Sequence, residues 1–114
     1  MKIVTKKQSI AIKNSDNCTA YEYETNNKNI NIAIIEISGR YPDNGKALNE
    51  ECTLMCYVIE GSGYLVVNNV EYTLEQGSVV LIEPNEEYYY EGNVKLCMPS
   101  APAWTPDQYR KILD

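Results

Sequence analysis

The sequence predicts an all-β fold of the sandwich or barrel class. Turn signals recur about every 8 to 12 residues, a spacing typical of many short strands. The segments between them are rich in β-branched residues and tyrosine, with ten tyrosines and no phenylalanine. A length of 114 residues fits one core, and no repeat or linker divides the chain. We therefore expect one domain over 1–114, with a barrel core at about 18–99 and a tail at 100–114.

The first half of the chain predicts two strands. A turn-like NSDN at 14–17 precedes a short strand, CTAYEYE at 18–24. The polar TNNKN separates it from INIAIIEI at 30–37, where alternation places Ile30, Ile32 and Ile34 on one face. Two glycines and a proline then predict a loop at 38–46.

The second half predicts a meander of strands at 53–60, 63–68, 70–74, 78–83, 87–92 and 94–99. Gly61 and Gly63 indicate a tight turn between the first two. Asn68-Asn69 fits a two-residue hairpin turn, because asparagine tolerates positive φ. In the tail, we expect a short helix from Pro106 with Thr105 as its N-cap.

The stretch YVIEGSGYLVVNNVEYTLEQGSVVLIEPNEEYYY at 57–90 resembles the cupin superfamily, and residues 39–55 occupy the place of that family's first-motif loop and ligand strand. The resemblance implies a double-stranded β-helix, or jelly-roll barrel. In the family, three histidines and a glutamate hold a divalent metal. The matching positions here are Leu54, Tyr88 and either Leu48 with Glu50 or Ala47 with Asn49. The chain contains no histidine, so we expect no stable metal in this pocket and no cofactor.

The cysteines do not replace that metal set. On a regular strand, Cys52 and Cys56 share a face but lie about 13 Å apart, too far to hold one ion. Their spacing is also not the CxxC of a redox motif. We interpret them as small residues of the cavity wall or core, with a reactive thiol as the alternative.

The inward-facing residues predict a small-molecule pocket with apolar walls and a few polar points. The alternative is a filled barrel without a cavity. Trp104 is either a lid or stacking platform, or a plug that pins the tail, and one bulge would exchange Asn49 and Glu50. The candidate ligand-binding residues are Asn49, Glu50, Cys52, Leu54, Cys56, Tyr88, Tyr90 and Trp104.

A net charge of −6 makes nucleic acid and anionic lipid poor partners, and no apolar run is long enough to span a membrane. The N-terminal segment lacks the features of a secretion signal, so we expect a cytoplasmic protein with reduced thiols. The favoured function is binding of a small polar or carbohydrate-like molecule without metal. The alternatives are a cofactor-independent sugar isomerase or epimerase using Glu50 or Tyr88 as acid or base, and a purely structural barrel. The resemblance also implies a homodimer.

Overall fold

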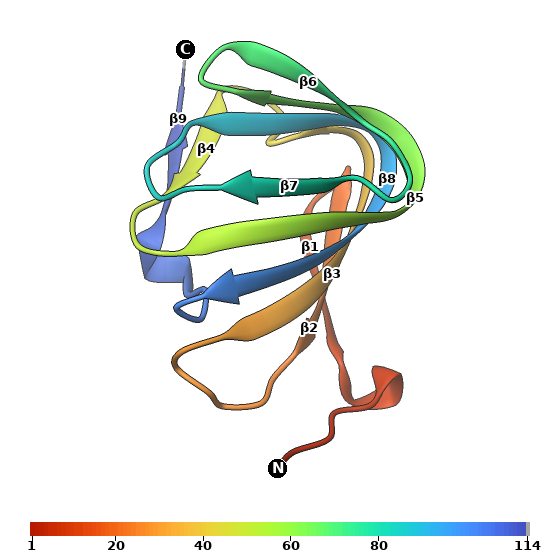
Figure 1. The fold of residues 1–114 in the computed structure, drawn as a ribbon, viewed down its shortest axis with the longest axis vertical. Coiled ribbons are helices and arrows are strands. Elements are labelled where there is room, and N and C mark those ends of the chain that lie inside the picture. The colour runs from red at the N-terminus through yellow and green to blue at the C-terminus, as the bar shows by residue number, and fades with distance from the viewer. Residues whose placement is uncertain (114) are drawn as a thin grey trace.

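The computed structural model describes residues 1–113 and consists mainly of β-strands wound into a curled sheet (Figure 1). Two 3-10 turns, η1 (Lys6–Gln8) and η2 (Pro106–Gln108), accompany the strands. Within residues 1–113, no helix is long and apolar enough to cross a membrane. The strands are β1 (Ile10–Ser15), β2 (Cys18–Tyr23), β3 (Asn31–Tyr41), β4 (Lys46–Asn49), β5 (Thr53–Val67), β6 (Val70–Leu74), β7 (Val79–Ile82), β8 (Tyr88–Ala101) and β9 (Tyr109–Ile112).

Two long strands, β5 and β8, form the frame of the sheet. They bend together around one side of the molecule (Figure 1). Along its other edge, β8 pairs with β3, and β2 and β1 follow in order. β6 and β7 pair with β5, while β4 joins β8 to β9. This antiparallel curl is the expected cupin-like, all-β barrel architecture.

The tight turn expected at Gly61 and Gly63 is wrong. β5 continues through both glycines, with a register shift between Val58 and Glu60 against β8. Gly61 has a φ of +90°, and a Cβ there would lie 2.0 Å from the carbonyl oxygen of Asn93. The glycines thus serve the close approach of two bending strands, which the local sequence does not distinguish from a turn.

Other turns lie where the sequence predicts them. Asn68 and Asn69 have φ of 50° and 69°, as the two-residue hairpin between β5 and β6 requires. Gly77, with a φ of +87°, reverses the chain before β7. The loop expected at 38–46 is shorter, because β3 extends to Tyr41 by pairing with Tyr90 of β8.

Strands extend beyond the expected core of 18–99 at both ends. β1 precedes it and pairs only with β2, so its side chains are mostly exposed and its hydrophobic signal is weak. The expected tail helix is limited to the turn η2, and β9 follows it to pair with β4. Asp114, the last residue of the expected tail, lies outside the described residues.

Strand alternation builds the core. Val58, Leu65 and Leu96 are fully buried on the inner faces of β5 and β8. In the expected strand at 30–37, Ile35 and Ile37 are the buried isoleucines, whereas Ile30 and Ile32 are exposed and Ile34 is partly buried.

Candidate ligand-binding cavity

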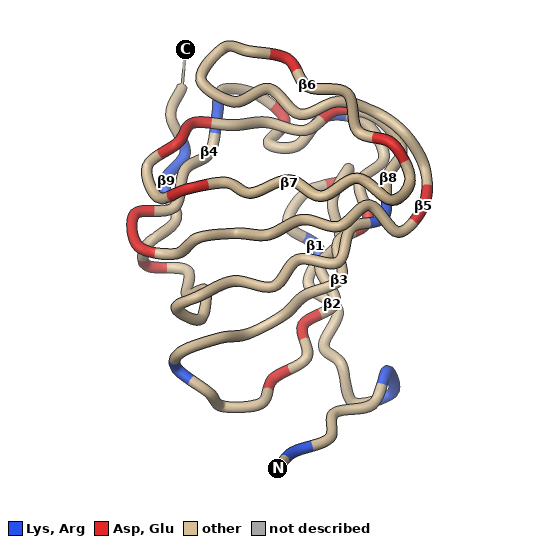
Figure 2. The backbone as a smooth tube through the Cα atoms, viewed as in Figure 1, with Lys and Arg blue, Asp and Glu red and all other residues tan. Residues whose placement is uncertain are grey.

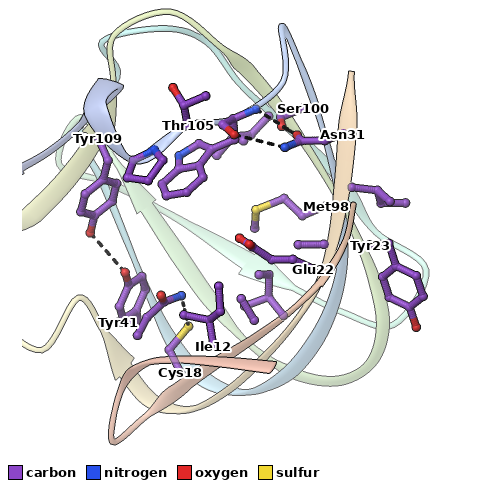
Figure 3. A pocket seen from close by; sticks show the side chains of 18 of the residues that line it. Ile12, Cys18, Glu22, Tyr23, Asn31, Tyr41, Met98, Ser100, Thr105 and Tyr109 are labelled. Atoms are coloured by element: carbon purple, nitrogen blue, oxygen red, sulfur yellow. Dashed lines mark hydrogen bonds between the residues drawn. The ribbon is translucent and has the colours of Figure 1, made fainter. Parts of the chain in front are cut away.

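A cavity of about 540 Å³ lies between the inner faces of β1–β3, β5 and β8 and the tail around Trp104 (Figure 3). The interior is therefore not filled by side chains on this side. Small residues make the room, since Ala20 of β2 and Ala33 of β3 face it. A volume of this size accommodates a small organic molecule. The lining side chains are Ile12, Asn14, Cys18, Ala20, Glu22, Tyr23, Glu24, Asn31, Ile32, Ala33, Ile35, Ile37, Tyr41, Leu54, Tyr88, Tyr90, Met98, Ser100, Trp104, Thr105, Pro106 and Tyr109.

The structure shows which residues of β4 face the inside of the barrel. Ala47 and Asn49 are buried on the inner side, at 0% and 3% exposure. Glu50 is exposed and forms an ion pair with Arg110 of β9, at 2.9 Å. Glu50 therefore lies outside the cavity, away from the place that its expected role in binding or as a catalytic acid or base requires.

A buried hydrogen-bond network connects Asn49 to two cavity-lining rings. Trp104 Nε1 donates to Asn49 Oδ1 at 2.7 Å, and Asn49 Nδ2 donates to the Tyr88 hydroxyl oxygen at 3.2 Å. Burial raises the pKa of Tyr88, so its hydroxyl stays protonated at neutral pH. Asn49 does not line the cavity itself, but it holds the rings that do.

The inner residues at the four metal positions implied by the family do not fit a divalent metal. They are Ala47, Asn49, Leu54 and Tyr88, and only the Asn49 amide oxygen and the Tyr88 oxygen are possible donors. The amide oxygen already accepts from Trp104, and the phenol is neutral. Among residues 1–113, no group of three or more His, Cys, Asp or Glu side chains is arranged to hold a metal ion.

The tail is fixed in place by two polar side chains. Asn31, at the start of β3, accepts from the Trp104 backbone N–H at 2.9 Å through Oδ1 and donates to the Trp104 carbonyl at 3.1 Å through Nδ2. Gln108 is 3% exposed, and its Oε1 accepts from the backbone N–H of Cys52 at 2.8 Å. Trp104 is therefore both pinned to the barrel and part of the cavity wall.

Cys52 and Cys56 are buried but do not line the cavity. All four cysteines are free, and burial raises the pKa of Cys18, Cys52 and Cys56 to about 11. These three thiols are protonated at neutral pH, which argues against the reactive-thiol alternative.

Four tyrosines, Tyr41, Tyr88, Tyr90 and Tyr109, contribute aromatic rings to the cavity wall. Tyr88 and Tyr90 pack edge to face, with ring centroids 5.5 Å apart. The Tyr90 hydroxyl lies 3.3 Å from Cys56 Sγ. The hydroxyls of Tyr41 and Tyr109 lie 3.3 Å apart, which links the end of β3 to the start of β9 (Figure 3).

The sequence analysis missed Glu22, whose carboxylate points into the cavity near Met98, while neighbouring Tyr23 points away (Figure 3). Burial, with a smaller contribution from Glu24, raises the pKa of Glu22. The signal was present in the strand pattern: Cys18 and Ala20 are buried, so alternation places Glu22 on the same inner face. Of the eight candidate residues, Leu54, Tyr88, Tyr90 and Trp104 line the cavity.

Residues 31–93 match the family model described as the AraC-like ligand binding domain. The chain belongs to this family. No curated protein sequence matches it. The matched range runs from the start of β3 to the bend of β8, and it includes the cavity positions Tyr41, Leu54, Tyr88 and Tyr90. Glu22 and Trp104 lie outside that range.

Solved structures share the fold of this AraC-like domain at low sequence identity. Pac13 of Streptomyces, described as a nucleoside dehydratase, has a TM-score of 0.88 at 16% identity, over 100% of this chain and 94% of its own. Ectoine synthase from P. lautus has a TM-score of 0.76 at 14% identity, over 99% and 91%. KdgF from Halomonas sp. has a TM-score of 0.73 at 9% identity, over 94% and 97%. At these identities the likeness establishes the cupin-like fold alone.

Proposed function

We propose that this protein binds a small organic molecule, without a metal, in the cavity between β1–β3 and the tail. The observation that carries the proposal is the cavity of about 540 Å³, lined by aromatic rings and a few polar groups. The family description, a ligand binding domain, supports it. A neighbour of the same fold, a variant of Streptomyces PAC13, has been solved with uridine. That example supports a barrel of this architecture holding a ligand of nucleoside size.

The metal-free part of the proposal rests on the donor set. An amide oxygen engaged by an indole and a neutral phenol do not replace three firm ligands. We expect protein purified without chelator to lose any metal on dialysis. Near-stoichiometric zinc, iron or manganese that survives dialysis would contradict this part while leaving ligand binding open.

A cavity-filling substitution tests the binding proposal. Ala33 faces the cavity, so Ala33→Phe should occupy part of it, whereas Thr19→Phe adds the same ring on the opposite face of β2. We expect a thermal-shift screen of sugars, nucleosides, amines and carboxylates to yield a stabilising compound for the wild type. A ligand at a hundred times its Kd stabilises by about 2.7 kcal/mol. The thermal shift caused by that compound should be lost in Ala33→Phe and kept in Thr19→Phe. An equal thermal shift in both variants would place the ligand elsewhere.

The isomerase or epimerase alternative is less well supported than binding, because neither of its two named groups is suited to act as a base in the cavity. Glu50 lies outside the cavity in an ion pair, and the raised pKa of Tyr88 makes it a poor base at neutral pH. A carbohydrate-like ligand remains compatible with binding alone, because aromatic walls and hydroxyls suit a sugar ring.

We also propose that the protein forms a homodimer through the outer face of β2, β3, β5, β7 and β8. Register places one apolar row across all five strands, running Val79, Tyr57, Cys97, Ile34 and Tyr21. Met55 and Leu81 lie beside that row, and both are about half exposed. Figure 2 shows that β7 and the part of β5 that pairs with it, residues 54–57, carry no charged residues.

A second copy of the chain is the occupant that this face fits best. Next to the row on the same face, Glu36 of β3 pairs in register with Lys95 of β8, and both line a hollow that also includes Tyr21 and Ile34. A face carrying both an acid and a base can pair each with its opposite in a twofold arrangement. Patches of this kind mark interfaces on soluble proteins.

Light scattering after size exclusion tests the dimer. We expect twice the chain mass of 13.0 kDa for the wild type. Met55→Lys should give the single-chain mass, and Val70→Lys, an equally exposed site on β6, should leave the dimer intact. A wild type of single-chain mass at high concentration, or a dimer unaffected by Met55→Lys, would contradict this interface.

Two further expectations belong to the same proposal. The four free cysteines accord with a reducing compartment, and we place the protein in the cytoplasm. The net charge of −6 leaves nucleic acid an unfavourable partner.

A further inference from the structure

We propose that the ligand is a small organic cation, an amine or quaternary ammonium group on an apolar body, and that Glu22 is the group that recognises its charge. This inference rests on the proposed binding function and specifies the ligand class of the same cavity. Three features of the cavity support it: the sign of its charge, the aromatic rings of its wall and the absence of an internal counter-ion.

The charged side chains of the cavity are all acidic. Glu22 and Glu24 lie among the lining residues, and no Lys or Arg does in the part of the chain that the structure describes. Glu22 projects into the cavity from the inner face of β2, between Ile10 of β1 and Ala33 of β3 (Figure 3). A cavity with two carboxylates and no cation disfavours an anionic ligand.

The carboxylate of Glu22 has no internal partner to neutralise it. Among residues 1–113, the ion pairs are Lys13 with Asp16 and Arg110 with Glu50, and no hydrogen bond reaches the Glu22 side chain. By contrast, polar side chains deeper in the barrel have hydrogen-bond partners. Asn49, for example, makes two hydrogen bonds with its side chain. A partly buried carboxylate without a partner reduces the stability of the fold, and a bound cation would relieve that cost.

The aromatic rings supply a second attraction for a cation. Tyr41, Tyr88, Tyr90, Trp104 and Tyr109 all line the cavity. The ring planes of Trp104 and Tyr109 make an angle of 66°, with ring centroids 6.3 Å apart. These two rings therefore form a corner of the cavity wall. Electron-rich ring faces attract ammonium groups, most strongly where water is excluded. The remaining wall, including Ile35 and Met98, suits an apolar body attached to the charge.

Three probes that share one ring and differ in charge test the inference by calorimetric titration. They are cyclohexylmethylamine as the cation, cyclohexylmethanol as the neutral compound and cyclohexanecarboxylate as the anion. The titrations use the wild type, Glu22→Gln and the control Glu75→Gln, which removes the same charge from an exposed site outside the cavity. We expect the wild type to bind the amine at least about tenfold more tightly than the alcohol. Glu22→Gln should lose that preference and still bind the alcohol, and Glu75→Gln should behave as the wild type.

The outcomes separate the two proposals. Equal or tighter binding of the alcohol or the carboxylate would overturn the cationic class while the cavity remains a binding site. A preference for the amine that Glu22→Gln retains would overturn the role of Glu22. If none of the three probes binds up to about 10 mM, the cationic inference is overturned, and the binding function is decided by the thermal-shift screen with Ala33→Phe and Thr19→Phe.

Discussion

Asn49→Ala tests the network that joins the barrel to its tail. Asn49 is 3% exposed, accepts from Trp104 Nε1 at 2.7 Å and donates to the Tyr88 hydroxyl at 3.2 Å. Each hydrogen bond contributes about 1 kcal/mol net, and a buried polar group left without a partner costs about 1–3 kcal/mol. In the variant, the half-buried Trp104 indole can replace its lost hydrogen bond with one to water. The Tyr88 hydroxyl cannot, because Tyr88 is only 5% exposed. We therefore expect Asn49→Ala to lower the free energy of unfolding by about 2–4 kcal/mol.

Urea unfolding followed by tryptophan fluorescence measures this loss, because Trp104 is the only tryptophan in the chain. The native emission of Asn49→Ala should also shift to longer wavelength as the indole gains water. Asn29→Ala, at an exposed position whose side chain makes no hydrogen bond, should change stability by under about 0.5 kcal/mol. In a double-mutant cycle with Tyr88→Phe, the combined loss should be smaller than the sum of the single losses. An additive cycle, or an Asn49→Ala protein as stable as Asn29→Ala, would refute the network.

Three other predictions follow from the same structure. Because folding raises the pKa of Glu22, this group favours the folded state below its unfolded pKa of about 4.3, and that contribution is lost as pH rises through the folded pKa. Glu22→Gln should therefore stabilise the protein in urea titrations at pH 7 and give no gain at about pH 3; an equal gain at both values would contradict the shift. Gly61→Ala should lower the free energy of unfolding by about 1–3 kcal/mol more than Gly77→Ala, since both glycines have φ near +90° but only the Gly61 Cβ would meet a carbonyl oxygen. Chemical denaturation measures both losses, and equal losses would exclude the clash. In a Cys97→Ser variant at pH 8, the remaining thiols of Cys18, Cys52 and Cys56, with a pKa of about 11, should react slowly with a disulfide reagent until urea unfolds the protein. Rapid labelling of the native protein would contradict their burial.

Local signals in the sequence predicted much of the fold. Asn68-Asn69 and Gly77 are turns whose chemistry depends only on adjacent residues, and both occur as expected. Gly61 and Gly63 were misinterpreted because their role depends on β8, about 30 residues away, where Gly92 packs against Gly63. β1 was missed because an edge strand with exposed side chains carries little hydrophobic pattern.

The site was less predictable than the fold. Leu54, Tyr88 and Tyr90 could be placed at the cavity because the glycine and proline spacing fixes their strands, and Trp104 because the tail was expected to carry a lid or plug. Asn49 and Glu50 could not be separated, since a single irregularity in the chain exchanges the faces of β4. Glu22 lies in a strand that was predicted correctly, and its inward position required knowing which face of β2 meets the core.

Above all, we propose that the cavity beside β2 and Trp104 holds a small molecule. A crystal structure of the wild-type protein grown with cyclohexylmethylamine tests it most directly. We expect density for the probe in the cavity, with its ammonium nitrogen within about 4 Å of the Glu22 carboxylate. An empty cavity at saturating probe, or a probe bound elsewhere on the barrel, would contradict it.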